Sequence, residues 1–184
     1  MKKKNKIIFF GTPDFAVTSL DALYSNFNIQ SVVTSPDRKS GRGQKLNKSD
    51  VKKYAQKHNL NILQPSNLND EGFINELKKL EPDLIIVVAF RKIPKEIFLI
   101  PKYGTINLHA SLLPNYRGAA PINWCLINNE TKTGVTTFFI NEKIDQGDIL
   151  LKDELIISNE DDFGSLYSKL SKIGAELLVK TIKG

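Results

Sequence analysis

The sequence contains one cysteine and two histidines among its 184 residues. A lone Cys125 excludes an internal disulfide framework, and without cysteine pairs the sequence gives no signal for a zinc site. No apolar run approaches the roughly 20 residues that span a membrane. The basic start, Met1–Lys6, is followed by too few apolar residues for the core of a signal peptide. We therefore expect a cytoplasmic protein that has a hydrophobic core and neither a metal nor a membrane partner.

Two common catalytic signatures are also missing. Gly11 follows the first apolar run without a G-x-G-x-x-G pattern, so nothing there supports a dinucleotide cofactor. There is no G-x-S-x-G sequence, and Cys125 lies in an apolar helical stretch, so no covalent nucleophile is evident. Any chemistry should therefore rest on acid, base and hydrogen-bonding groups.

The order of apolar runs predicts an α/β fold in one domain. Strand Ile7–Phe10, a helix to about Leu23 and strand Ile29–Ser35 form a βαβ unit, which implies a parallel sheet. The apolar run Asp83–Ala89 is typical of a central strand buried on both faces. Further strands are expected at Ile62–Leu63, Thr105–His109, Gly134–Ile140 and Ile149–Ile157, and helices at Asp50–His58, Asn69–Leu80, Pro94–Leu99, Pro121–Ile127 and about Asp161–Ile182. Helix caps are expected at Thr12, at Asn47 or Ser49, and at Asn159 or Asp161.

The positive charge behind the net charge of +6 is concentrated between Arg38 and Lys57. The basic residues of this stretch, set against Asp50 alone, are Arg38, Lys39, Arg42, Lys45, Lys48, Lys52, Lys53 and Lys57. The segment Pro36–Lys48 contains two glycines and no periodicity, which predicts a mobile surface loop. Such a loop would suit contacts with phosphates. Charge alone, however, favours an ordinary solvated lysine-rich surface.

Three polar residues are candidates for chemistry. Asn107 and His109 are two residues apart on a predicted strand, so their side chains share a face. The Asn107 amide suits a developing oxyanion, His109 can donate or shuttle a proton, and Asp145 could pair with the imidazole. Together they would suit acyl-type transfer through a tetrahedral intermediate. Strand-end and turn roles for the same residues are open, and spacing alone slightly favours these structural roles.

An ordered set of motifs resembles the 10-formyltetrahydrofolate-dependent formyltransferases. The motifs are NLH at 107–109, SLLP at 111–114, YRGAAPI at 116–122 and DQGD at 145–148. Three further features resemble the members that act on initiator methionyl-tRNA: FGTPDFA at 10–16, PDR at 36–38 with GRGQKL at 41–46, and RGAAPI at 117–122. The resemblance covers nearly the whole chain.

The resemblance implies a Rossmann-like catalytic domain over residues 1–184, with a mostly parallel sheet and helices on both faces. It implies that the family's catalytic residues fall on Asn107, His109 and Asp145, and that the co-substrate is 10-formyltetrahydrofolate. The implied folate contacts are Ser111, Leu112, Leu113 and Pro114. The implied contacts with initiator methionyl-tRNA are Arg42 first, then Arg38, Lys39 and Lys45. Members that act on tRNA normally also have a C-terminal β-barrel domain, which this chain lacks; we expect a monomer.

Two alternatives stay open. One is a folate-dependent N-formyltransferase of an amino-sugar nucleotide or another small amine, which would share the catalytic residues but would not need the basic loop. Glycinamide ribonucleotide is a weaker candidate, because a phosphate-binding glycine-rich turn would be expected at Gly11-Thr12-Pro13. The other alternative is a non-catalytic RNA-binding Rossmann module, which would have no need for Asn107, His109 and Asp145 together.

Overall fold

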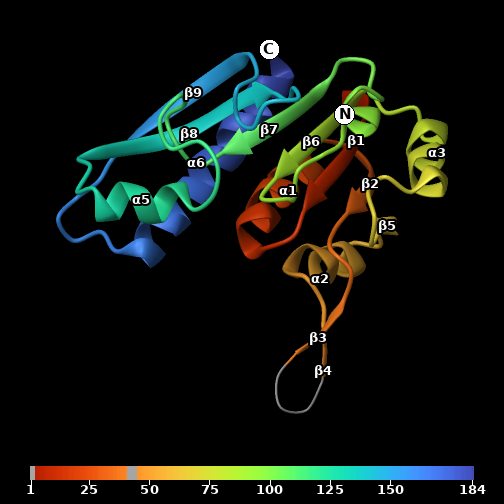
Figure 1. The fold of residues 1–184 in the computed structure, drawn as a ribbon, viewed down its shortest axis with the longest axis horizontal. Helices are drawn as coiled ribbons and strands as arrows, with labels where there is room; N and C mark the ends of the chain where they lie inside the picture. The colour runs from red at the N-terminus through yellow and green to blue at the C-terminus, as the bar shows by residue number, and fades with distance from the viewer. Residues whose placement is uncertain (1–2, 41–44) are drawn as a thin grey trace.

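A computed structural model describes residues 3–40 and 45–184 of the chain (Figure 1). The strands of its main sheet are β1 (Lys3–Gly11), β2 (Phe27–Val33), β5 (Ile62–Leu63), β6 (Leu84–Val88), β7 (Thr105–His109), β8 (Lys132–Phe139) and β9 (Ile149–Ile156). They lie in the order β5-β2-β1-β6-β7-β8-β9, and the pairings from β5 to β7 are parallel. β8 runs antiparallel to both β7 and β9. The structure confirms the α/β fold with a mostly parallel sheet.

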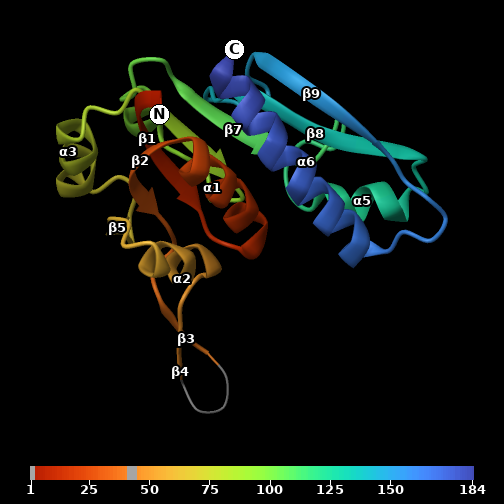
Figure 2. The ribbon, with the colours of Figure 1, turned by 180° about the vertical axis from the view of Figure 1, so that it is seen from behind.

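Helices cover both faces of this sheet. They are α1 (Asp14–Asn26), α2 (Asp50–Lys57), α3 (Glu71–Lys79), α4 (Lys95–Phe98), α5 (Pro121–Ile127) and α6 (Phe163–Lys183). Helices α1 and α6 pack together on one face, which is in front in Figure 2, and α3 and α4 contribute to the core on the other. The expected helices on both faces are therefore confirmed.

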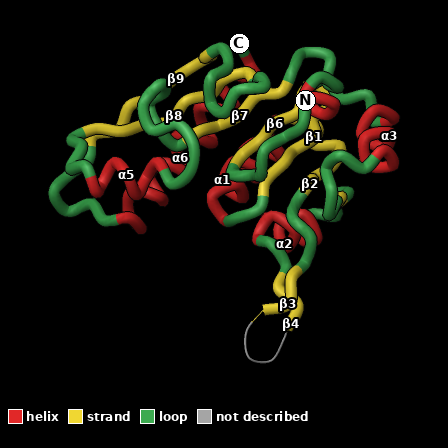
Figure 3. Tube along the Cα trace, in the orientation of Figure 1, coloured by secondary structure: helices red, strands yellow, loops and turns green. Residues whose placement is uncertain are grey.

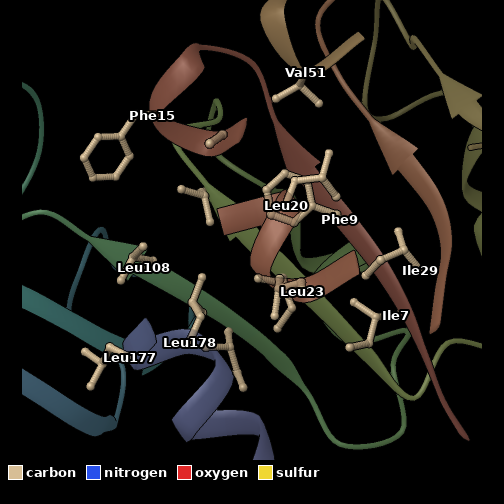
Figure 4. Packing of buried hydrophobic residues seen from close by; sticks show 14 of the residues in the cluster. Ile7, Phe9, Phe15, Leu20, Leu23, Ile29, Val51, Leu108, Leu177 and Leu178 are labelled. Atoms are coloured by element: carbon tan, nitrogen blue, oxygen red, sulfur yellow. The ribbon is translucent and has the colours of Figure 1, made fainter. Parts of the chain in front are cut away.

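Strand β1 shows how the sequence separates two hydrophobic cores. Ile7 and Phe9 pack with Leu20 of α1 in the larger core, part of which is drawn in Figure 4. Ile8 and Phe10 belong to the smaller core, which is covered by α3 and α4. This alternation follows from the two-residue period of a strand. Every residue of β6 is buried, as expected for a central parallel strand.

The helix caps agree only partly with the expectations. Ser49 caps α2, because its hydroxyl accepts from the Lys52 N–H at 3.0 Å. The expectation of Asn159 or Asp161 for the last helix is wrong: Asp162 caps α6 in a reciprocal capping box with Ser165. The expected Thr12 cap is also wrong. Pro13 occupies that position, and the Thr12 hydroxyl instead lies 3.0 Å from the hydroxyl of Ser35.

The expectation of an irregular loop over Pro36–Lys48 is wrong in part. Strand β3 (Arg38–Ser40) pairs antiparallel with β4 (Lys45–Asn47), and the two project away from the main sheet (Figure 3). Residues 41–44 lie outside the described part of the chain. The pairing left no hydrophobic pattern in the sequence, because the residues of both strands other than Leu46 are polar, and the Leu46 side chain is 59% exposed.

Candidate active site

A cavity of about 650 Å³ opens at the carboxyl ends of β6 and β7. Its walls come from the segment after β6, the end of β7, the segment leading into α5, the segment after β8 and the start of α6. The lining includes Val87, Ala89, Phe90, Arg91, Lys92, Ile93, Asn107, His109, Gly118, Pro121, Phe138, Ile140, Lys143, Asp145, Phe163 and Tyr167. Ligands of open α/β sheets bind at this edge of the sheet.

Strand β7 directs Asn107 and His109 to the cavity. Ile106 and Leu108, which alternate with them, pack into the larger core, although Leu108 also contributes to the cavity lining. The expected sharing of one strand face is therefore confirmed. Because β7 is fixed between β6 and β8, both polar side chains stand on a rigid element.

His109 is only 8% exposed, and both of its ring nitrogens have neighbours. Nε2 lies 2.8 Å from the main-chain oxygen of Tyr116. A carbonyl oxygen can only accept, so Nε2 carries a proton and donates it. Nδ1 lies 3.7 Å from Oδ2 of Asp145, which is within ion-pair distance but too long for a hydrogen bond. Nδ1 is therefore the ring nitrogen available to a third group.

Asp145 is fixed by the segment that precedes α5. Its Oδ2 accepts from the Gly118 N–H at 2.8 Å, and its main-chain oxygen accepts from Nε of Arg117 at 2.9 Å. The residue adopts a left-handed conformation, with φ of 50°. These bonds join the segment after β8 to the segment before α5 and bring the carboxylate to His109.

The Asn107 side chain lines the same cavity and is half-buried. Its amide makes no side-chain hydrogen bond with the described part of the chain, so it can donate to a ligand. An amide, an imidazole and a carboxylate thus meet on the wall of a largely apolar cavity. Such a set can stabilise an oxyanion and move a proton.

Comparison with known proteins assigns the family. The family profile described as formyl transferase matches residues 5–182. The chain belongs to the formyl transferase family. Members of this family use donors of the formyl-tetrahydrofolate type. The methionyl-tRNA formyltransferase of Flavobacterium johnsoniae is 53% identical over 182 residues, which are 98% of this chain and 58% of that protein. The chain thus spans little more than half the length of the curated relatives that it matches.

Solved structures of formyl transferases superpose on this chain. The phosphoribosylglycinamide formyltransferase of Streptococcus pneumoniae superposes with a TM-score of 0.82 at 16% identity, covering 97% of both chains. A sugar 3N-formyltransferase, whose crystal structure was determined in the presence of dTDP and 5-N-formyl-THF, has a TM-score of 0.72 at 26% identity. That match covers 97% of this chain and 62% of the other.

The segment Ser111–Pro114, expected to contact folate, is built into the framework of the chain beside the cavity. The Ser111 hydroxyl donates to the Asn115 carbonyl at 2.7 Å, and the Ser111 carbonyl accepts from the Thr136 hydroxyl at 2.7 Å. Ser111 and Leu113 are buried, and none of the four residues lines the cavity. Their contact with folate stays a prediction.

Sequence reasoning missed much of the cavity wall. Phe90 and Ile93 follow β6, Ile140 follows β8, and Tyr167 comes from the second turn of α6. The Tyr167 hydroxyl donates to the Asp14 carboxylate and accepts from the Phe15 N–H at 3.0 Å. Burial, followed by the Asp14 carboxylate, raises the pKa of Tyr167 to about 12. A neutral tyrosine thus joins the first and last helices at one side of the cavity.

The residues expected to contact tRNA lie on or beside the hairpin. Arg38 is exposed at the start of β3, and Lys39 and Lys45 belong to β3 and β4. Arg42 lies outside the described residues. The base of the hairpin is attached to α2, because Nζ of Lys52 lies 2.6 Å from Oδ2 of Asp37.

This attachment should be sensitive to acid. Hydrogen bonds from Lys52 and then Gln64 lower the pKa of Asp37 below its ordinary value of 3.8. The pKa of Asp37 is lower in the folded chain than in the unfolded chain. The interaction therefore stabilises the fold fully at pH values above the unfolded pKa, and this stabilisation is lost as the pH falls through the folded pKa. We expect Asp37→Asn to lower the free energy of unfolding at pH 7 and to lower it by less near pH 3, below the ordinary value of 3.8. Chemical denaturation at both pH values, with the exposed Asp153→Asn as control, measures this; equal effects at both would contradict it.

Cys125 has the surroundings of a structural residue, not of a catalytic one. Cys125 is buried against the Thr133 hydroxyl at 3.4 Å, and burial raises the pKa of its thiol. That environment does not suit a nucleophile. Within the described ranges, no group of three histidine, cysteine or acidic residues is arranged to bind a metal. No helix in those ranges is long and apolar enough to cross a membrane.

Proposed function

We propose that residues 1–184 form a catalytic domain that transfers the formyl group of 10-formyltetrahydrofolate to the α-amine of initiator methionyl-tRNA. The observation that carries this proposal is that Asn107, His109 and Asp145 line one cavity, with Nδ1 of His109 lying 3.7 Å from Oδ2 of Asp145. Membership of the formyl transferase family supports the reaction class, and the name of the 53% identical relative supports the acceptor. Such an acceptor would place the reaction in the cytoplasm.

The cavity has the properties that the donor requires. Its volume of about 650 Å³ is in the ordinary range for a cofactor-sized ligand. Apolar side chains, among them Ile93, Phe138 and Ile140, line the walls and would hold a flat ring system. The polar side chains at the end of β7 would then meet the formyl group. No metal is needed to polarise this carbonyl, because Asn107 and His109 can donate to it.

The proposed residues act on the transfer as follows. The acceptor amine attacks the formyl carbon, a C–N bond forms, and the carbonyl oxygen becomes an oxyanion. Asn107 donates an amide N–H to this oxyanion, and charged His109 donates from Nδ1. Asp145 stabilises the imidazolium and assists removal of the proton from the attacking nitrogen. Cleavage of the bond to N10 of the donor, with protonation of N10, releases tetrahydrofolate and formylated methionyl-tRNA.

The hairpin would supply the tRNA contact. It projects from the sheet beside α2, and basic residues lie on both (Figure 1). Lys48, Lys53 and Lys57 are exposed there, in addition to Arg38. Such contacts with phosphates are sequence-independent and weaken with salt.

The test is formyl transfer from 10-formyltetrahydrofolate at high protein concentration and low salt. The acceptors are charged initiator methionyl-tRNA, a dTDP-linked amino sugar, and none. We expect formylated methionyl-tRNA as the product. Formylation of the amino sugar alone would overturn the proposed acceptor in favour of a small amine. Salt-sensitive tRNA binding without any formyl transfer would instead indicate an RNA-binding module.

A further inference from the structure

Tyr116 connects the active site to a hydrogen-bond cluster that the proposed chemistry does not use. Its main-chain oxygen accepts from Nε2 of His109 at 2.8 Å. Its hydroxyl donates to Oε1 of Glu130 and accepts from Nδ2 of Asn128 at 2.9 Å. A single residue thus joins the imidazole to two polar side chains beyond the end of α5.

Asn128 and Glu130, the two partners of the Tyr116 hydroxyl, are held by main-chain hydrogen bonds to α5. The Asn128 N–H donates to the Trp124 carbonyl at 3.0 Å, and the Glu130 N–H donates to the Cys125 carbonyl at 3.0 Å. Cys125 is 1% exposed, so the end of α5 is anchored in the core. The Glu130 carboxylate also raises the pKa of the Tyr116 hydroxyl above its ordinary value, since it accepts the hydroxyl proton. Tyr116 therefore remains a donor at neutral pH.

The conformation of Tyr116 explains why such an anchor is needed. Its φ is 55°, in the left-handed region that side chains with a β-carbon disfavour. Without its hydroxyl bonds the residue would be free to relax toward a common conformation. Relaxation would rotate the main-chain carbonyl away from Nε2 of His109.

We propose that Tyr116, Asn128 and Glu130 form a positioning cluster that holds His109 in the tautomer protonated at Nε2. In that tautomer Nδ1 faces Asp145 without a proton, and it is the nitrogen that takes up the proton with which the charged imidazole donates to the formyl oxygen. A carbonyl oxygen that accepts from one ring nitrogen keeps the proton on that nitrogen, and the other nitrogen of the neutral ring is then unprotonated. The inference rests on the proposed function for the role of His109, and it adds three residues that are not among those lining the cavity.

The test is nitrogen-15 NMR of the imidazoles, combined with steady-state kinetics. The chain has two histidines, and His58, which stacks on Tyr54 with ring centroids 4.2 Å apart, is an internal reference. At a pH where the rings are neutral we expect His109 of the parent to be protonated at Nε2. Tyr116→Phe should mix the two tautomers, leave His58 unchanged and lower kcat about tenfold with little change in KM.

Further variants separate positioning from general damage. Glu130→Ala should reproduce the effects of Tyr116→Phe, whereas Glu130→Gln retains an acceptor and should restore both the tautomer and kcat. Tyr103→Phe, at a half-exposed tyrosine near the start of β7, is the matched control. The proposal is overturned if the tautomer is unchanged in both Tyr116→Phe and Glu130→Ala, or if it changes while kcat does not. A parent without transferase activity would refute the proposed function, yet the NMR measurement would still decide the cluster.

Discussion

His109→Ala is expected to lower the turnover of formyl transfer by roughly 10²–10³ while the chain remains folded. The variant loses a donor to the oxyanion, and removal of one such donor typically has an effect of this size. Asn107→Ala should lose a similar factor, because its amide is the second donor. The measurement is single-turnover formyl transfer, with circular dichroism to verify the fold.

His58→Gln is the matched control for this prediction. His58 is the C-cap of α2 and stacks on Tyr54, and it does not line the cavity. Its variant should retain nearly the turnover of the parent. A His109→Ala variant that keeps near-normal turnover would remove His109 from the reaction and with it the proposed mechanism.

Gly147→Ala is expected to damage both stability and activity. A β-carbon at this position would lie 1.5 Å from the Phe139 carbonyl oxygen, so the main chain would have to move. We expect a loss of about 1–3 kcal/mol in the free energy of unfolding, as is typical of overpacking. Because Asp145 is two residues away on the same segment, its carboxylate should move from His109, and a displacement of about 1 Å can lower activity about 10²-fold.

Gly164→Ala provides the corresponding control. Its β-carbon would meet only the Asp162 carboxylate, at 3.4 Å, and alanine favours a helix over glycine. Thermal unfolding and formyl transfer should therefore be close to those of the parent. If Gly147→Ala is as stable and active as Gly164→Ala, the segment after β8 tolerates displacement and does not fix Asp145.

Local patterns predicted most of the sheet and one wall of the site. The two-residue period predicted that Asn107 and His109 share one face of β7, and the continuous apolar run Asp83–Ala89 predicted the central strand β6, which is buried throughout. These features depend on neighbouring residues in the sequence. The hairpin of β3 and β4 left no such pattern, because both of its faces are polar or exposed.

Contacts between distant segments could not be derived from the residues alone. The approach of Asp145 to His109 depends on the antiparallel register of β7 and β8 and on the bond from Gly118. Tyr116 acts through its main-chain oxygen, for which no side-chain pattern exists. The folate contacts expected at Ser111–Pro114 and the tRNA contacts expected on the hairpin stay predictions.

The bond between the first and last helices has a consequence for synthesis of the protein. Tyr167 and Asp14 are 153 residues apart in the sequence, and Tyr167 also binds the Phe15 N–H. A ribosome releases β1 and α1 well before α6, which packs against α1 in the larger core. Until then the apolar side of α1 lacks its cover and the cavity lacks a wall. Folding of this part of the chain therefore cannot be completed until α6 has left the ribosome, and before that the nascent chain exposes apolar surface.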